Sequence, residues 1–268
     1  MMSLKFNNKP IQTYPMQSVA PTVAAVLSIP SPASAEAGYI EKTVVDLKGV
    51  KGVAVLAIDA LGYEIFNHFK DCMPCLKSIF ENNSATIRSI MPSITPVNFS
   101  CMVTGASQEV HKVKSLFSNI ECETLFQVLR KNGMKSAGLG RKGYTGHELM
   151  GRYADYSTEG KAESDEEVEK IFNDYLKTEK PEFIIVQYGA TDDQFHKYGP
   201  YSDKARDAVI KADLWLSRCI DNLKSEGYGI MILADHGQHN NDDKDSHLLG
   251  VHGGSTDEDC IVPFTWTR

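Results

Sequence analysis

The feature that most constrains the fold is an alternation of short apolar runs with longer segments of helical period. Continuous apolar runs rich in β-branched and aromatic residues lie at residues 53–58, 183–188, 230–234 and 261–266. Such runs, apolar throughout, are typical of strands covered on both faces. Segments with a helical period lie between them, at residues 123–133, 164–181 and 202–227. The alternation predicts an α/β fold of three layers, α/β/α, around a mostly parallel sheet.

The predicted helices carry start and stop signals. Gly133 and Gly227 follow two of them, and glycine commonly ends a helix. Ser164 precedes the third, with acidic residues in the first turn, as expected of an N-cap. Residues 19–37 form a modest apolar run with prolines that ends in small residues. This pattern shares features with a signal peptide, but we expect it to contain a helix of the mature fold.

Size and composition allow one sizeable core. The chain has 268 residues, of which 42% are hydrophobic. No internal repeat, low-complexity tract or linker divides it. We therefore expect a single domain over residues 1–268, in which residues 1–45 form an N-terminal extension whose helix packs on the rest.

Charge and cysteine content limit the partners and the compartment. The chain has 28 basic and 35 acidic residues, a net charge of -7, and no basic run, so a nucleic-acid polymer is not an expected partner. No apolar stretch reaches the roughly 18 residues of a membrane span. Six scattered cysteines are too few for a disulfide scaffold. A cytoplasmic location is expected, with a secreted or periplasmic one as the alternative, and the oligomeric state stays open.

Aspartates follow three of the predicted strands. Asp59 and Asp235 come directly after two apolar runs, and Asp192 lies shortly beyond a third. A single aspartate in this place is usually a turn former or a helix cap. Three of them point to a common site, because ligands of open α/β sheets bind at the carboxyl ends of the strands.

Histidines accompany these aspartates. His236 follows Asp235 directly, His196 lies four residues after Asp192, and His252 stands in the segment VHGG. A separation of four residues puts two side chains on one face of a helical turn. Three carboxylates and three imidazoles can hold two divalent cations and leave positions for substrate or water. Zinc suits such mixed donors best, and manganese or iron would accept the same ligands.

A hydroxyl group precedes a helix-like segment at residues 91–105, MPSITPVNFSCMVTG. Thr95 stands there before a proline and a run of small and polar residues. The N-terminus of a helix with a hydroxyl beside it is suited to bind phosphate.

Five ordered motifs resemble the signatures of a known superfamily. They are AIDALG, SITPVNFSCMVTG, TDDQFHKYGP, LADHGQ and VHGGSTDEDCIVPF, and the match that includes them spans residues 53–264. Together they resemble the alkaline phosphatase superfamily, most of all its type I phosphodiesterase/nucleotide pyrophosphatase branch. The resemblance implies an alkaline phosphatase-like fold. Core helices and strands fill residues 98–192, which leaves no place for the large cap domain that mutases of the superfamily insert.

The resemblance also implies two metal sites and a phosphoryl contact. One metal would be surrounded by Asp59, Thr95, Asp235 and His236, and the other by Asp192, His196 and His252. The side chain of Asn98 would help to hold a phosphoryl oxygen.

The implied activity is metal-dependent hydrolysis of a small phosphate ester or nucleotide-like substrate, at phosphodiester or pyrophosphate bonds. Thr95 would attack phosphorus, and water would then release the resulting phosphothreonine. Two divalent ions about 4 Å apart would activate the hydroxyl and clamp the attacking and leaving oxygens. The alternatives are a phosphomonoesterase of the same superfamily and a metal-binding member without turnover. Sulfatase activity is disfavoured, because no Cys or Ser with the required Pro and Arg surrounds Thr95.

Several positions have rivals. Ser93 and Ser100 are alternative hydroxyls, although the spacing from Thr95 to the Thr-Gly pair at 104–105 matches the family. Asp193 competes with Asp192 as the ligand, and His239 and His247, which we interpret as loop residues, are substitutes for a ligand histidine.

Basic residues near the predicted site have less certain roles. Arg141 and Lys142 follow a predicted strand, where they would either contact a substrate phosphate or lie on the surface. His111, expected at the surface, is followed by Lys112 where relatives commonly have glycine.

Overall fold

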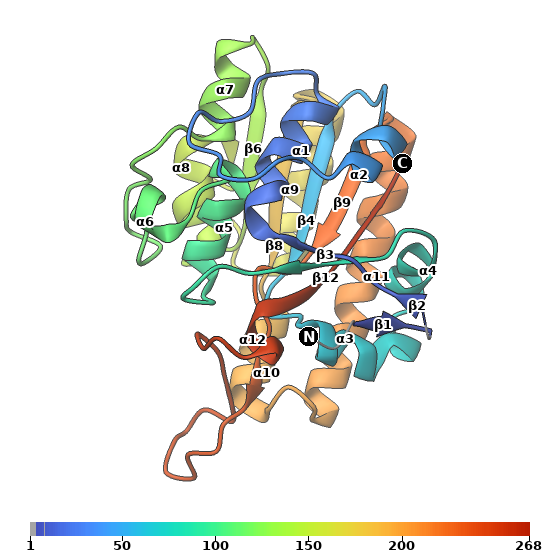
Figure 1. Ribbon diagram of the computed structural model, residues 1–268, viewed down its shortest axis with the longest axis vertical. Helices are drawn as coiled ribbons and strands as arrows, with labels where there is room; N and C mark the ends of the chain where they lie inside the picture. Colours follow the sequence, from blue (N-terminus) through green and yellow to red (C-terminus); the bar gives the residue numbers. More distant parts are fainter. Residues whose placement is uncertain (1–3, 8) are drawn as a thin grey trace.

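The computed structural model describes residues 4–7 and 9–268, so residues 1–3 and 8 of the predicted domain and N-terminal extension lie outside the described residues. Figure 1 shows a sheet of eight strands between layers of helices. In spatial order the strands are β3 (Thr13–Pro15), β5 (Ala85–Arg88), β12 (Ile261–Thr267), β9 (Gly229–Leu233), β4 (Val53–Ile58), β8 (Phe183–Tyr188), β6 (Ser136–Leu139) and β7 (Tyr156–Ser157). All except β12 run in one direction. The predicted three-layer α/β/α fold with a mostly parallel sheet is confirmed.

Helices cover both faces of the sheet. In Figure 1, α1 and α5 lie on one face, and α9 and α11 lie on the other. The helices are α1 (Val19–Val26), α2 (Glu41–Asp46), α3 (Tyr63–Phe69), α4 (Pro74–Asn82), α5 (Thr95–Thr104), α6 (Gln108–His111), α7 (Leu125–Lys131), α8 (Gly151–Tyr153), α9 (Asp165–Thr178), α10 (Ala190–Tyr198), α11 (Asp203–Glu226) and α12 (Asp257–Cys260). Short 3-10 turns span Met16–Ser18 and Lys70–Cys72, and a π-helix spans Gly146–Met150.

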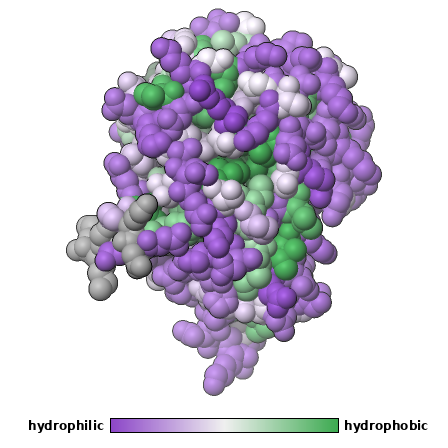
Figure 2. All heavy atoms as spheres, turned by 90° about the vertical axis from the view of Figure 1, so that its right-hand side faces the viewer, coloured by the Kyte–Doolittle hydropathy of each residue, from purple (hydrophilic) through white to green (hydrophobic). Residues whose placement is uncertain are grey.

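Two small hairpins complete the secondary structure. β1 (Lys5–Phe6) pairs with β2 (Lys9–Pro10), and β10 (His239–Asn240) pairs with β11 (Gly250–Val251). Of the helices in the described part of the chain, none has the length and apolar character needed to cross a bilayer. The face seen in Figure 2 is mostly hydrophilic, with a band of hydrophobic residues near its middle.

The apolar runs form the central strands. β4 and β8 coincide with the predicted runs, and every residue in them is buried. The run at 261–266 also forms a strand, β12, but it lies antiparallel between β5 and β9. A strand that is apolar on both faces can be buried in either direction. Its sequence therefore does not indicate that β12 runs antiparallel to its neighbours.

Local signals place the helix ends. The Ser164 hydroxyl accepts a hydrogen bond from the Glu167 N–H, and the Glu167 carboxylate accepts one from the Ser164 N–H, which caps α9. Gly227 ends α11 with a φ of 83°. Within residues 19–37, α1 packs against α5, and its Val19, Ala20 and Val23 are fully buried.

The carboxyl ends of β4, β9 and β8 are adjacent in the sheet, since β4 pairs with both of its neighbours in parallel. In Figure 1 this edge lies at the bottom, where α10, α12 and the protruding orange-red loop between β10 and β11 gather. The segments that follow β4, β8 and β9 are far apart in the sequence, and the strand order brings them to one edge of the sheet.

Candidate functional site

Six side chains converge at this edge in two groups. Asp59 follows β4, Asp235 and His236 follow β9, Asp192 and His196 lie on α10, and His252 follows β11. The first group is Asp59, Asp235 and His236, and the second is Asp192, His196 and His252. Within each group, the candidate ligand atoms lie within 4.8 Å of one another. The structure thus brings together all six predicted carboxylates and imidazoles.

The first group is buried and lies beside the predicted nucleophile. Asp59, Asp235 and His236 are at most 1% exposed. The Nε2 atom of His236 lies 3.2 Å from Asp235 Oδ2 and 3.7 Å from Asp59 Oδ1. The hydroxyl oxygen of Thr95, in the first turn of α5, lies 3.1 Å from the same His236 Nε2 and 3.5 Å from Asp59 Oδ1. The hydroxyl therefore faces the point where the three ligand atoms meet.

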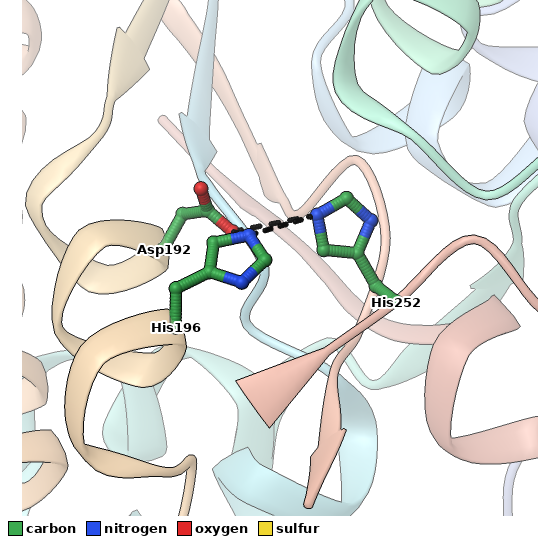
Figure 3. A group of neighbouring side chains, drawn as sticks. All are labelled: Asp192, His196 and His252. Carbon is green, nitrogen blue, oxygen red and sulfur yellow. Dashed lines mark hydrogen bonds and ion pairs between the residues drawn. The ribbon is translucent and has the colours of Figure 1, made fainter. Parts of the chain in front are cut away.

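The second group is more open. Figure 3 shows Asp192 and His196 on one helix, facing His252 from the loop after β11. The Nε2 atom of His196 lies 3.2 Å from Asp192 Oδ1 and 3.2 Å from His252 Nε2. The rings of His236 and His252 stack with centroids 3.9 Å apart, which connects the two groups.

Backbone carbonyls orient each of the three histidine rings. The Nδ1 atom of His196 lies 2.8 Å from the Gly250 carbonyl, that of His252 lies 3.0 Å from the Ser93 carbonyl, and that of His236 lies 3.0 Å from the Gly237 carbonyl. Because a carbonyl only accepts, the Nδ1 atoms of His236 and His252 carry the proton and their Nε2 atoms present a lone pair to the cluster. The Nδ1 atom of His196 also lies 2.9 Å from the side-chain nitrogen of Gln238, so two neighbours hold this ring in place.

Among the residues that the structure describes, two buried carboxylate oxygens lack a hydrogen-bond donor. They are Asp192 Oδ1 and Asp235 Oδ2, and each belongs to one of the two groups. A buried anionic oxygen without a partner is costly, and a divalent cation would satisfy it. With their imidazole and carboxylate donors, both groups have the chemistry of divalent-cation ligands.

The charges in the site perturb its proton affinities. Burial, and after it the carboxylates of Asp235 and Asp192, raise the pKa of Asp59 well above its usual value. Burial also raises the pKa of Asp235, although the nearby His236 opposes this effect. Burial and then His236 lower the pKa of His252 to about 3. Burial and neighbouring carboxylates thus disfavour the ionised form of Asp59, and burial disfavours the protonated form of His252, as is common where functional groups are clustered.

Competing residues have other roles. The hydroxyl of Ser93 donates to the Gly254 carbonyl and that of Ser100 to the Pro96 carbonyl, so both are engaged away from the cluster. The carboxylate of Asp193 accepts hydrogen bonds from Arg141 at 2.7 Å and from the Tyr144 hydroxyl at 2.5 Å. It is Asp192 that lies in the cluster.

The histidine rivals lie outside the cluster. His239 pairs through Nδ1 with the buried carboxylate of Asp259 at 2.7 Å, and His247 is exposed in the loop between β10 and β11. Lys142 lies at the surface, 3.7 Å from Glu163.

Asn98 differs from the prediction. Its side chain is fully buried, its oxygen accepts from the Ile90 N–H at 2.8 Å, and its nitrogen lies 3.3 Å from the carbonyls of Ile90 and Ile94. Contact with a phosphoryl oxygen would require these bonds to break. The amide instead holds the loop that leads to Thr95.

His111 is also placed differently from the prediction. It is fully buried rather than exposed, and its Nδ1 accepts from the Val113 N–H at 3.1 Å. Lys112 has a φ of 62°, in the left-handed region that glycine adopts more readily than lysine.

The sequence analysis missed Gln187, a 2% exposed residue of β8. Its side-chain nitrogen donates to Asp59 Oδ2 at 2.5 Å. The available signal was a single amide within the otherwise apolar run FIIVQY, because a buried amide needs partners.

Known proteins resemble the chain in sequence pattern and in fold. The profile of the family described as type I phosphodiesterase / nucleotide pyrophosphatase matches residues 53–252. Murine ectonucleotide pyrophosphatase / phosphodiesterase 5 superimposes with a TM-score of 0.65 at 12% identity, covering 80% of this chain and 87% of that chain, and it was also solved as an inactive form in complex with AMP. No curated protein matches the chain in sequence.

Two bacterial structures share the fold as well. Phosphonoacetate hydrolase from Sinorhizobium meliloti 1021, in complex with phosphonoformate, has a TM-score of 0.56 at 22% identity, covering 70% of this chain and 56% of that chain. The C-terminal periplasmic domain of EcEptC from Escherichia coli, in complex with Zn, has a TM-score of 0.56 at 12% identity, covering 81% of this chain and 72% of that chain. The cytoplasmic location expected from the sequence stays a prediction.

Proposed function

Because the chain belongs to the type I phosphodiesterase/nucleotide pyrophosphatase family and is thereby a hydrolase of phosphate esters, we propose that it cleaves phosphodiester or nucleotide pyrophosphate bonds through a phosphothreonine on Thr95. The observation that carries the proposal is the position of the Thr95 hydroxyl, 3.1 Å from His236 Nε2 and 3.5 Å from Asp59 Oδ1. The hydroxyls of the rivals Ser93 and Ser100 donate to backbone carbonyls instead of facing these ligand atoms.

Two divalent ions, with zinc as the first choice, would be held by the two groups of side chains. One would lie among Asp59, Asp235, His236 and Thr95, and the other among Asp192, His196 and His252. When bound, such ions lower the pKa of a coordinated hydroxyl and neutralise charge on the phosphoryl oxygens. The unpartnered oxygens of Asp192 and Asp235 support this assignment.

The protein's own residues orient the attack. Thr95 occupies the first turn of α5, so the positive end of the helix dipole lies beside the phosphoryl group that its hydroxyl attacks. The bond from phosphorus to the leaving oxygen breaks as the bond to Thr95 forms, and water later displaces Thr95. Asn98 and Ser93 hold the loop before α5 through backbone contacts, which keeps the hydroxyl in place.

The charge around the site favours a diester over a monoester. Among the described residues, no lysine or arginine forms an ion pair with Asp59, Asp192 or Asp235. Arg141 is instead held by Asp193 at 2.7 Å and by Asp165 at 3.4 Å. A monoester dianion carries one more negative charge than a diester and gains most from a free cation, which this site does not offer.

The test compares a diester with a monoester. The metal-loaded chain should hydrolyse bis-p-nitrophenyl phosphate at least about tenfold faster than p-nitrophenyl phosphate, a difference of 1.4 kcal/mol in barrier. Because one structural neighbour was solved with AMP, a dinucleotide pyrophosphate that releases AMP is the next substrate to assay. Protein treated with a chelator should lose turnover, and added zinc or manganese should restore it. This result would show that the reaction requires a metal.

Variants of Thr95 test the nucleophile. Thr95→Val keeps the shape and removes the hydroxyl, so turnover should be lost, whereas Thr95→Ser should retain part of it. Rapid quenching of the wild type should trap a phosphoryl group on the peptide that contains Thr95. Full activity in Thr95→Val would refute the proposed intermediate, and the absence of metal-dependent turnover of either ester would refute the enzyme itself.

A further inference from the structure

Gln187 is an amide inside the hydrophobic core. It lies on β8 between the apolar residues of a strand that is buried throughout, and it is 2% exposed. A buried carboxamide is costly unless both of its ends form hydrogen bonds. Both ends of Gln187 do, one with Asp59 and the other with the backbone of Gly146.

The direction of these bonds is settled by chemistry. The backbone N–H of Gly146 can only donate, so the atom of Gln187 that lies 2.6 Å from it must be the oxygen. The nitrogen of Gln187 then faces Asp59 Oδ2 at 2.5 Å and donates to it. The close approach needs glycine at position 146, because a Cβ there would lie 2.9 Å from Gln187 Cβ and would clash with the Leu139 carbonyl oxygen.

We propose that Gln187 is a positioning residue that fixes which oxygen of Asp59 faces the metal site, an inference that rests on the proposed two-metal function. With Oδ2 held by the amide, Oδ1 remains directed at His236 Nε2, 3.7 Å away, and at the Thr95 hydroxyl, 3.5 Å away. The carboxylate is thereby locked as a ligand through one oxygen. A hydrogen bond from behind a ligand keeps its geometry without a change in the ligand itself.

The proposed role of Gln187 predicts that its loss affects only one of the two metal sites. Gln187 contacts the group of Asp59, Asp235 and His236, and it has no hydrogen bond to the group of Asp192, His196 and His252. Loss of the amide should therefore weaken one ion and leave the other unchanged. A residue that only fills space in the core would have no such selectivity.

The experiment is a zinc titration of the metal-free full chain by calorimetry with a competing chelator. The wild type should bind two ions, and Gln187→Met should bind one of them about 10–100-fold more weakly, with the other affinity unchanged. Gln187→Asn keeps an amide that is too short to span both partners, and it should show the same loss. Gln127→Met is the matched control, because it breaks the cap of α7 and leaves the site untouched.

A measurement on the wild type keeps the test valid if both variants fail to fold. The side-chain amide resonances of Gln187, in a spectrum of the nitrogen-labelled chain, should shift as the ion of the Asp59 group binds. The positioning role would be refuted if these resonances did not shift when zinc binds. It would also be refuted if the Gln187 variants bound both ions with the affinities of the wild type. A wild type that takes up no zinc would instead refute the two-metal function, so the two failures are distinguishable.

Discussion

Replacing Asp235 by asparagine should have opposite effects on stability with and without metal. In the metal-free protein, the carboxylates of Asp59 and Asp235 are buried, and their candidate ligand atoms lie within 4.8 Å of each other. Two unit charges at that distance repel by about 3.5 kcal/mol at an effective dielectric constant near 20. Asp235→Asn removes this repulsion and keeps an oxygen for the Ala60 N–H, which now donates to Asp235 Oδ1 at 3.2 Å.

The new amide nitrogen would also find a partner. Asp235 Oδ2 lies 3.2 Å from the Nε2 lone pair of His236, and an N–H in its place would donate to that lone pair. Because burial and then Asp235 raise the pKa of Asp59, which favours its neutral form, we expect the unfolding free energy of the metal-free protein to rise by less than the full repulsion, about 1–3 kcal/mol.

With zinc present the sign should reverse. An ion at 100 times its dissociation constant stabilises the folded chain by about 2.7 kcal/mol, and the variant lacks one carboxylate ligand for it. Urea unfolding followed by circular dichroism, in chelator and in excess zinc, measures both differences. Asp242→Asn, in the exposed loop between β10 and β11, is the charge-matched control. A variant less stable than the wild type in chelator, or an equal gain from zinc in both proteins, would refute the reasoning.

Three further predictions concern residues around the site. Asn98→Ala leaves the half-buried Ile90 N–H without its acceptor and should lower the unfolding free energy by about 1 kcal/mol, whereas a pure phosphoryl contact would lower activity and leave urea unfolding unchanged. Burial lowers the pKa of His111 from 6.5 to about 4, so its contribution to stability is present above pH 6.5 and is lost as the pH falls toward 4. In His111→Gln, the unfolding free energy should fall less between pH 6.5 and pH 4, by up to about 3 kcal/mol. Unfolding curves measured in chelator across this range check it, and the same pH dependence in the variant and the wild type would contradict the assignment. Lys112→Gly relieves a φ of 62° and should raise the unfolding free energy by about 0.5–1 kcal/mol, and a lower melting temperature would contradict this.

The sequence predicted the elements and the kinds of ligand because both are local signals. β4 and β8 were predictable from continuous apolar runs, and the start of α9 from the Ser164 cap. The separation of four residues between Asp192 and His196 predicted, from the sequence alone, that both side chains lie on one face of a helical turn. Placing Asp59, Asp235 and Asp192 at strand ends was enough to expect them at one edge.

Tertiary structure decided what depends on contacts between distant segments. Asp193 differs from Asp192 in the sequence by one position only, and the arginine and tyrosine that engage it come from the loop after β6. Asn98 was predicted to face a phosphoryl oxygen, yet the loop at Ile90 folds back over it and takes its hydrogen bonds. The direction of β12 and the partners of Gln187 are likewise set by strand order. Periodicity and spacing encode which face a residue occupies, but a partner far along the chain is fixed only when the sheet has assembled.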